Sequence, residues 1–260
     1  MSLFKRGYKV AKEDGLMSFL SESLDYLYWE CKEKRWRISS SAKISIQGVE
    51  AEFGTSGRAP SSLRVFEKGE REMLSDVLKE ISIDDVFWDI GANIGYYSCF
   101  IGQQAKVAAF EPSPIAAEHC RDNLSRNDIE ASVYEYALSD SRETITLHPG
   151  RIARAENEPV EVEKKRGDKI AEDLSLPTVV KIDVEGAEVE VINGMEDILS
   201  SDKCRLLYCE VHTEKKEDRK AVSDYGENLE TFNNKINELG FEVEILSRRG
   251  NEVHIKGKKN

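Results

Sequence analysis

The sequence predicts an α/β fold with a doubly wound, mostly parallel sheet of seven strands and one antiparallel strand near the C-terminus. Five short apolar runs alternate with segments of helical periodicity, as expected when helices connect parallel strands. A further helix and a hairpin of two strands follow. Polar residues recur at the ends of the runs, where such sheets bind ligands. The five runs are residues 86–90, 107–110, 132–136, 179–184 and 206–211, and the hairpin strands are residues 241–246 and 252–256.

The N-terminal part is predicted to be a helical and β extension over residues 1–62, ahead of a main domain over residues 63–260. Residues 1–38 carry apolar side chains at spacings of three and four. This spacing predicts an amphipathic helix, which docks on the main domain, pairs with a second copy in a homodimer, or contacts a lipid or large substrate. Residues 43–53 alternate as a strand does, and the Gly, Ser, Thr and Pro content of residues 54–62 predicts a loop.

Apolar spacing and capping residues indicate the remaining elements. Residues 70–81 fit an amphipathic helix, and Ser113 with Pro114 fits the N-cap and first position of another. Residues 144–147 fit a short strand. Residues 148–158 have glycine, proline and charges but no apolar period, so we expect a loop there.

Composition excludes several classes of protein. The 260 residues are 40% hydrophobic and 33% charged, which is typical of a globular chain. The net charge of -12 argues against a nucleic-acid partner, because phosphate binding needs a basic surface. Five cysteines without a C-x-x-C pair indicate reduced thiols and a cytoplasmic protein. Since no apolar run has the length of a transmembrane helix, we expect no integral membrane segment.

The stretch Asp89-Ile-Gly-Ala-Asn-Ile-Gly95 predicts a junction of strand, turn and helix. Glycine at 91 and 95 permits positive φ and close approach of a ligand, and the helix that follows directs its positive end at the turn. Asn93 stands where a dinucleotide-binding loop needs glycine, and Asp89 would repel a pyrophosphate. Glu111 lies 22 residues after Asp89, where an acid usually binds a ribose diol. The turn therefore favours a ligand with an ammonium and a carboxylate, such as the methionyl part of S-adenosylmethionine.

Acidic residues and a histidine follow the later strands. We predict that Asp183, Glu185, Glu210 and His212 include the catalytic base, since an alcohol that accepts a methyl group must lose its proton. Asp183 and Glu185 alternate along the chain, so one could approach the site while the other orients a partner group. Asp183, Glu210 and His212 also have the donor atoms for a divalent ion. Because clustered acids are common without a metal, none is predicted.

Four strings of the sequence, in this order, resemble the FkbM family of S-adenosylmethionine-dependent methyltransferases. The resemblance covers about residues 65–212 and implies the Rossmann-like fold of class I methyltransferases, with S-adenosyl-L-methionine as cofactor. The last string is the most specific of the four. The strings are Asp89-Ile-Gly-Ala-Asn-Ile-Gly-Tyr-Tyr-Ser, Phe110-Glu-Pro-Ser, Ala137-Leu-Ser-Asp and Lys181-Ile-Asp-Val-Glu-Gly-Ala-Glu.

The resemblance also implies a cofactor site. The glycine turn would surround the methionyl group and Glu111 would bind the ribose hydroxyls. Ala137 and Leu138 would line the adenine, and Asp183 would lie beside the sulfonium and the incoming nucleophile. The complete set of implied cofactor residues is Asp89, Gly91, Ala92, Asn93, Gly95, Glu111, Pro112, Ala137, Leu138 and Asp183.

The expected function is O-methylation of a hydroxyl on a sugar, glycolipid or small metabolite, so the expected partner is a small-molecule or glycan acceptor. Its pocket is expected from residues 1–62, including the 54–62 loop, and from the 148–158 loop. Three alternatives stay open. They are an N-methyltransferase acting on a protein or amine, a nicotinamide-dependent oxidoreductase, and a non-catalytic nucleoside-binding module. The sequence of the glycine turn weighs against the second, and the intact Asp89, Glu111 and Asp183 weigh against the third.

Overall fold

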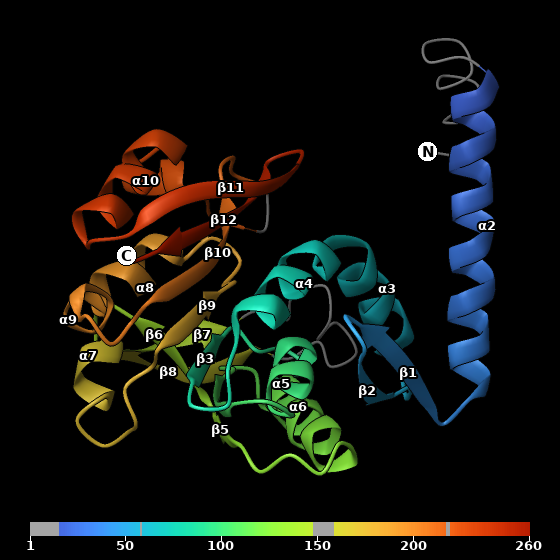
Figure 1. The fold of residues 1–260 in the computed structure, drawn as a ribbon, viewed down its shortest axis with the longest axis horizontal. Coiled ribbons are helices and arrows are strands. Elements are labelled where there is room, and N and C mark those ends of the chain that lie inside the picture. Colours follow the sequence, from blue (N-terminus) through green and yellow to red (C-terminus); the bar gives the residue numbers. More distant parts are fainter. Residues whose placement is uncertain (1–15, 58, 148–158, 217–218) are drawn as a thin grey trace.

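The computed structural model describes residues 16–57, 59–147, 159–216 and 219–260. Its centre is a seven-stranded sheet (Figure 1). Within the described residues, β12 alone runs against the direction of the other strands of this sheet, which confirms the predicted fold class. In spatial order the strands are β11 (Glu242–Arg249), β12 (Glu252–Lys258), β10 (Leu206–His212), β9 (Val179–Ile182), β3 (Val86–Ile90), β4 (Lys106–Phe110) and β5 (Ser132–Tyr134).

Helices cover both faces of this sheet (Figure 1). Successive side chains of a strand point to opposite faces, so Phe87 packs into the core on one side of β3 and Trp88 into the core on the other. Burial on both faces explains why the central strands are almost wholly apolar in sequence. The first face carries α4 (Arg71–Glu80), α5 (Tyr96–Ile101) and α6 (Pro114–Arg126), and the second carries α8 (Glu188–Gly194), α9 (Glu196–Ser200) and α10 (Leu229–Glu238).

The helix caps follow the sequence signals. Ser113 is the N-cap of α6, where its hydroxyl accepts a hydrogen bond from the Ala116 amide at 3.4 Å, and Pro114 takes the first helical position, as predicted. Asn228 caps α10 in the same way, through the amides of Glu230 and Thr231 at 2.8 and 3.0 Å. These caps set where the connecting segments leave the sheet.

The N-terminal elements are α2 (Leu16–Ile38), at the edge of the molecule, and a hairpin of β1 (Ser41–Ile46) and β2 (Val49–Gly54) beside it (Figure 1). The hairpin replaces the single strand predicted over residues 43–53. Gln47 and Gly48 take φ of 51° and 81°, which reverses the chain and pairs its two halves.

The loop predicted over residues 54–62 is wrong in its second half, because α3 (Ala59–Gly69) begins there. The apolar residues of α3 face the core at Leu63 and Phe66. One hydrophobic core runs from α2, through the hairpin and α3, to the first face of the main sheet. The predicted boundary between the N-terminal extension and the main domain, after residue 62, falls inside α3 and stays a prediction.

A second, three-stranded sheet has the order β6-β8-β7. Its strands are β6 (Tyr136–Ser139), β8 (Val160–Arg166) and β7 (Glu143–Leu147). The strand predicted over residues 132–136 is therefore two strands, because the chain leaves the main sheet at the exposed Glu135. The short α7 (Gly167–Ile170) and the 3-10 helix η1 (Val222–Tyr225) complete the described elements. The predicted loop over residues 148–158 lies outside the described residues.

Candidate active site

The glycine turn after β3 lies directly against the end of β9. Gly91, Asn93 and Gly95 take φ of 75°, 53° and 79°, so the turn needs residues that tolerate the left-handed region. A Cβ on Gly91 would lie 1.8 Å from the carbonyl oxygen of Asp183. The lack of a side chain at 91 therefore brings the two neighbouring strand ends into contact.

Glu111 joins the end of β4 to this turn. Its Oε2 accepts a hydrogen bond from the Asn93 amide at 2.8 Å, and its Oε1 accepts one from the Ser113 amide at 2.8 Å. Burial raises the pKa of Glu111, although these two bonds oppose the shift. Among the described residues, the buried Oδ1 of Asn93 has no hydrogen-bond partner. An unsatisfied buried acceptor beside a fixed carboxylate is suited to a polar ligand at this turn.

Asp89 lies beneath the turn and is completely buried. Its Oδ2 accepts a hydrogen bond from the Ser98 hydroxyl at 2.6 Å, and its Oδ1 lies 3.2 Å from Nζ of Lys181. The same Lys181 donates to the carbonyl oxygen of Gly91 at 2.9 Å. Burial alone would lower the pKa of Lys181, but the nearby carboxylates outweigh it and raise the pKa. Asp89 and Lys181 thus form a buried ion pair that supports the backbone of the turn at Gly91. Direct contact of Asp89 with a cofactor stays a prediction.

Asp183 lies at the open end of β9, where its side chain retains 19% exposure. Its Oδ2 is 3.8 Å from Nζ of Lys181. Burial, and then the negative charge of Glu210, raise the pKa of Asp183 to about 7, while Lys181 opposes the shift. Asp183 therefore has a partly exposed carboxylate, and its backbone carbonyl packs against the turn.

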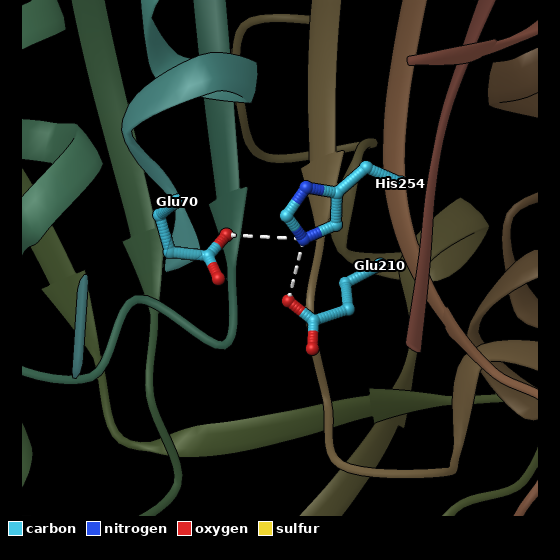
Figure 2. A group of neighbouring side chains, drawn as sticks. All are labelled: Glu70, Glu210 and His254. Carbon is cyan, nitrogen blue, oxygen red and sulfur yellow. Dashed lines mark hydrogen bonds and ion pairs between the residues drawn. The ribbon is translucent and has the colours of Figure 1, made fainter. Parts of the chain in front are cut away.

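Glu210 is held from the side of the C-terminal hairpin. Figure 2 shows Nε2 of His254 between the carboxylates of Glu70 and Glu210, at 3.6 and 2.9 Å. Nη2 of Arg249 lies 2.9 Å from Oε1 of Glu70, 3.1 Å from Oε2 of Glu210 and 3.4 Å from the same His254 nitrogen. A Cβ on Gly69 would lie 1.9 Å from Nη1 of Arg249, so the glycine gives the guanidinium room. The guanidinium thus supplies the positive charge of this cluster.

His212 lies at the end of β10, between two carboxylates. Its Nδ1 is 2.6 Å from Oε1 of Glu188, and its Nε2 is 3.4 Å from Oε1 of Glu210. Burial alone would lower the pKa of His212, but Glu188 and Glu210 outweigh it and raise the pKa to about 10. Glu188 is completely buried and its Oε1 also accepts from the Gly186 amide at 2.8 Å, so the ring has a fixed orientation.

Glu185 points away from this group. It has φ of 52°, its side chain is 77% exposed, and its Oε2 lies 3.3 Å from Nη1 of Arg219. Three of the four predicted catalytic residues therefore meet, namely Asp183, Glu210 and His212, whose donor atoms lie within 4.8 Å of one another.

The remaining predicted cofactor residues lie near the edge of the site. Ala92 is buried in the turn, and Pro112 is half-buried beside Glu111. Ala137 is half-buried on β6, whereas the side chain of Leu138 packs into the core of the second face. Leu138 thus leaves only its backbone for an adenine ring.

Sequence reasoning missed the partners of these residues. Lys181 is a charged residue in an otherwise apolar strand, which is a signal for a buried ion pair. The polar positions of the last strand recur with period two and include His254, whereas Glu70, Glu188 and Arg249 lie on other elements. The residues missed are Glu70, Lys181, Glu188, Arg249 and His254.

An open, mostly parallel sheet with a glycine turn and an acid at successive strand ends defines the class of Rossmann-like methyltransferases. Two solved structures have the fold. FkbM from Methylobacillus flagellatus has a TM-score of 0.50 at 17% identity and covers 68% of this chain and 44% of its own. Magnesium protoporphyrin IX methyltransferase from Synechocystis, solved with bound S-adenosylmethionine, has a TM-score of 0.50 at 11% identity and covers 77% and 83%.

The particular family follows from the sequence. A family model for the methyltransferase FkbM domain matches residues 89–251, so the chain belongs to the FkbM methyltransferase family. Hexuronic acid methyltransferase AglP of Haloferax volcanii is 35% identical over 153 residues, which is 56% of this chain and 63% of that relative. The 2-O-methyltransferase NoeI of Sinorhizobium fredii is 32% identical over 197 residues, which is 64% of this chain and 77% of NoeI. The match thus spans less than two thirds of AglP.

In the described part of the chain, no helix combines the length and the apolar character needed to cross a membrane. The prediction of no integral membrane segment agrees with this finding.

Proposed function

We propose that this chain transfers a methyl group from S-adenosylmethionine to a hydroxyl of a sugar-containing acceptor. One observation carries the proposal. The glycine turn expected to hold the methionyl group packs against the backbone carbonyl of Asp183, because Gly91 has no side chain, and the carboxylate of the same residue is partly exposed. The names of two relatives, a hexuronic acid methyltransferase and a 2-O-methyltransferase, support a sugar hydroxyl as the acceptor.

The residues at the turn fit the cofactor. Glu111 is held by two amides and keeps lone pairs for the ribose hydroxyls. The unsatisfied Oδ1 of Asn93 would accept from the cofactor's ammonium group. The helix α5 has only six residues, so its dipole is a weak binding site for the cofactor's carboxylate. When bound, S-adenosylmethionine supplies a methyl group already activated by its sulfonium.

The chain's own residues then position the acceptor and take its proton. Asp183 would accept the proton of the acceptor hydroxyl while the acceptor oxygen takes the methyl group that the cofactor would supply. Lys181 is fixed by Asp89 and holds Asp183 in place from below. Glu210 and His212 border the acceptor's side. We assign Glu185 to positioning of the loop after β9 through Arg219.

A hydroxyl acceptor suits this site better than an amine. A neutral amine attacks without prior loss of a proton, whereas an alcohol needs a base within reach. The backbone contact between Gly91 and Asp183 brings the residue that has this partly exposed carboxylate next to the turn, which supports Asp183 as the base. An assay with sugar and peptide acceptors distinguishes O-methylation from N-methylation.

The first test is calorimetric titration of the full chain with S-adenosylhomocysteine, with NAD as the control ligand. We expect saturable binding of S-adenosylhomocysteine alone, in the micromolar range that corresponds to about 8 kcal/mol. Binding of NAD alone would place the chain among the oxidoreductases and refute the proposal.

The second test follows transfer of a labelled methyl group from S-adenosylmethionine. The acceptors are an aryl glucuronide, the matched aryl glucoside and a lysine-containing peptide. Label on either sugar, stable to acid hydrolysis as an ether, supports O-methylation. Label on the peptide alone would replace the proposal by N-methylation.

A further inference from the structure

Two clusters at the strand ends have metal-ligating side chains, and they differ in one respect. The first consists of Glu70, Glu210 and His254. Nη2 of Arg249 lies within 3.4 Å of an atom of each of these three side chains, so a guanidinium already holds the cation position. In the second cluster, as far as the described residues show, Lys181 pairs with Asp183 at 3.8 Å and Arg249 with Glu210 at 3.1 Å, and neither cation is paired with all three side chains.

The second cluster consists of Asp183, Glu210 and His212. Glu188 lies 2.6 Å from Nδ1 of His212 and, as a carboxylate, can only accept a hydrogen bond. The Nδ1 proton therefore points at Glu188, which leaves Nε2 facing Oε1 of Glu210. A proton on Nε2 or a metal ion would each supply the positive charge that belongs between these two atoms.

The distance between these atoms suits an ion better than a proton. Nε2 of His212 is 3.4 Å from Oε1 of Glu210, longer than the usual N–H···O bond of about 2.7–3.2 Å. Two ligand atoms that each lie about 2.1 Å from one ion are about 3.0–3.4 Å apart at octahedral to tetrahedral angles. A carboxylate on the second nitrogen of a metal-bound histidine is also the usual way in which proteins orient that ligand.

The cations beside this cluster are shared among several carboxylates. Among the described residues, Lys181 pairs with Asp89 and Asp183, whereas Arg249 pairs with Glu70, Glu210 and Glu252. Glu188 is paired with His212.

We propose that Asp183, Glu210 and His212 bind one divalent first-row cation, with Glu188 orienting the imidazole. Two carboxylate oxygens and one imidazole nitrogen suit Mn²⁺, Fe²⁺ or Zn²⁺ better than Mg²⁺, which prefers oxygen alone. The exposed side of Asp183 leaves positions for water or an acceptor hydroxyl. The ion binds that oxygen and lowers the pKa of the hydroxyl before it attacks. This role rests on the proposed function, whereas binding of the ion does not.

The test is titration of the chelator-treated full chain with Mn²⁺, followed by electron paramagnetic resonance of the free ion. We expect one ion per chain. His212→Gln and Asp183→Asn should each weaken binding by at least 30-fold. Glu188→Gln should weaken it by roughly 10- to 100-fold, as substitutions that free a ligand's orientation do. Far-ultraviolet circular dichroism checks that each variant is folded. Asp183→Asn should disturb the fold least, because the side chain of Asp183 is partly exposed.

Two controls identify the cluster. Glu185→Gln removes a carboxylate two residues from Asp183 that faces Arg219, so Mn²⁺ affinity should change by less than threefold. His254→Gln alters the cluster that Arg249 fills, and because His254 also holds Glu210 at 2.9 Å, it should weaken Mn²⁺ binding, but less than His212→Gln does. Loss of binding in His254→Gln but not in His212→Gln overturns the assignment, as does the absence of saturable binding below 1 mM in the wild type.

Titration of the same preparations with S-adenosylhomocysteine separates this inference from the proposed function. Binding of S-adenosylhomocysteine without binding of Mn²⁺ would support the proposed methyltransferase site and refute the metal site. Binding of Mn²⁺ without binding of S-adenosylhomocysteine would support the metal site and refute the proposed function.

Discussion

Nζ of Lys181 lies 3.2 Å from Oδ1 of Asp89, its register partner across the parallel strands β9 and β3. Both side chains are buried, at 3% and 0% exposure. Removal of one partner leaves an uncompensated charge in the core, which costs about 3–5 kcal/mol. We therefore expect Lys181→Met to lower the free energy of unfolding in urea by that amount. The double variant Asp89→Asn with Lys181→Met should recover at least half of the loss, and a loss below 1 kcal/mol in Lys181→Met would contradict the pairing.

Glu111→Ala should weaken binding of S-adenosylhomocysteine by roughly 10- to 100-fold, which is about 1.4–2.7 kcal/mol. The variant loses the carboxylate expected at the ribose and the acceptor of the Asn93 and Ser113 amides. Calorimetry with a 2′-deoxy analogue separates the two effects. Wild type should bind this analogue more weakly than S-adenosylhomocysteine, whereas Glu111→Ala should bind both alike. Equal affinity of wild type and Glu111→Ala for S-adenosylhomocysteine would remove the ribose assignment.

Asp183→Asn should reduce turnover far more than cofactor binding. Loss of a general base typically lowers rates by 10²–10⁴-fold. We expect kcat to fall by at least about 100-fold while the Kd for S-adenosylhomocysteine changes less than threefold, as measured by stopped assays and calorimetry. Glu185→Gln is the matched substitution on the same loop, and its carboxylate faces Arg219. If both substitutions reduced kcat equally, Asp183 would not be the base.

Glu190 links α8 to the second sheet, and its ionisation should make the free energy of unfolding depend on pH. Burial alone would raise its pKa, but hydrogen bonds from Lys164, Tyr225 and Ser139 outweigh it and lower the pKa to about 2. A lowered native pKa stabilises the fold above the unfolded value of 4.5, and this stability is lost as the pH falls toward 2. Glu190→Gln should cost about 1–3 kcal/mol at pH 7 and markedly less near pH 2.5. Urea unfolding at both pH values measures this difference, and an equal cost at both would contradict it.

The exposed face of α2 tests the predicted homodimer. Leu24 and Leu27 are 67% and 57% exposed, although leucine is usually buried. We expect a dimer in sedimentation velocity at micromolar concentration, and a monomer for the double variant Leu24→Glu with Leu27→Glu. Ile83→Glu, at a residue 77% exposed in the turn before β3, serves as the matched control and should stay dimeric. A monomeric wild type would refute the prediction.

The central strands and the glycine turn could be derived from the sequence because their causes are local. Apolar runs of strand length, a capping serine before proline and glycines at positive φ act within a few residues of themselves. The resemblance to the FkbM family rests on such local strings, and the family match over residues 89–251 confirms it. Catalysis by Asp183 or Glu210 stays a prediction.

Two elements escaped sequence reasoning for physical reasons. β8 (Val160–Arg166) is rich in Glu and Lys, and it forms because β6 and β7 supply partners on both sides. The helical start at Ala59 is hidden by Pro60 and two serines, and packing of Leu63 and Phe66 outweighs their low propensity. In both places tertiary contacts decided what local preference left open.

Which acids meet, and with what charge, was decided by tertiary structure alone. Glu70 and Arg249 are 179 residues apart and share one ion pair. Asp89 looks like a ligand-binding acid in sequence, yet the fold places it beneath the turn against Lys181. A local pattern can show that a carboxylate ends a strand. The charge it faces, and hence its pKa and its availability to a substrate, depends on side chains that only folding brings within a few ångströms.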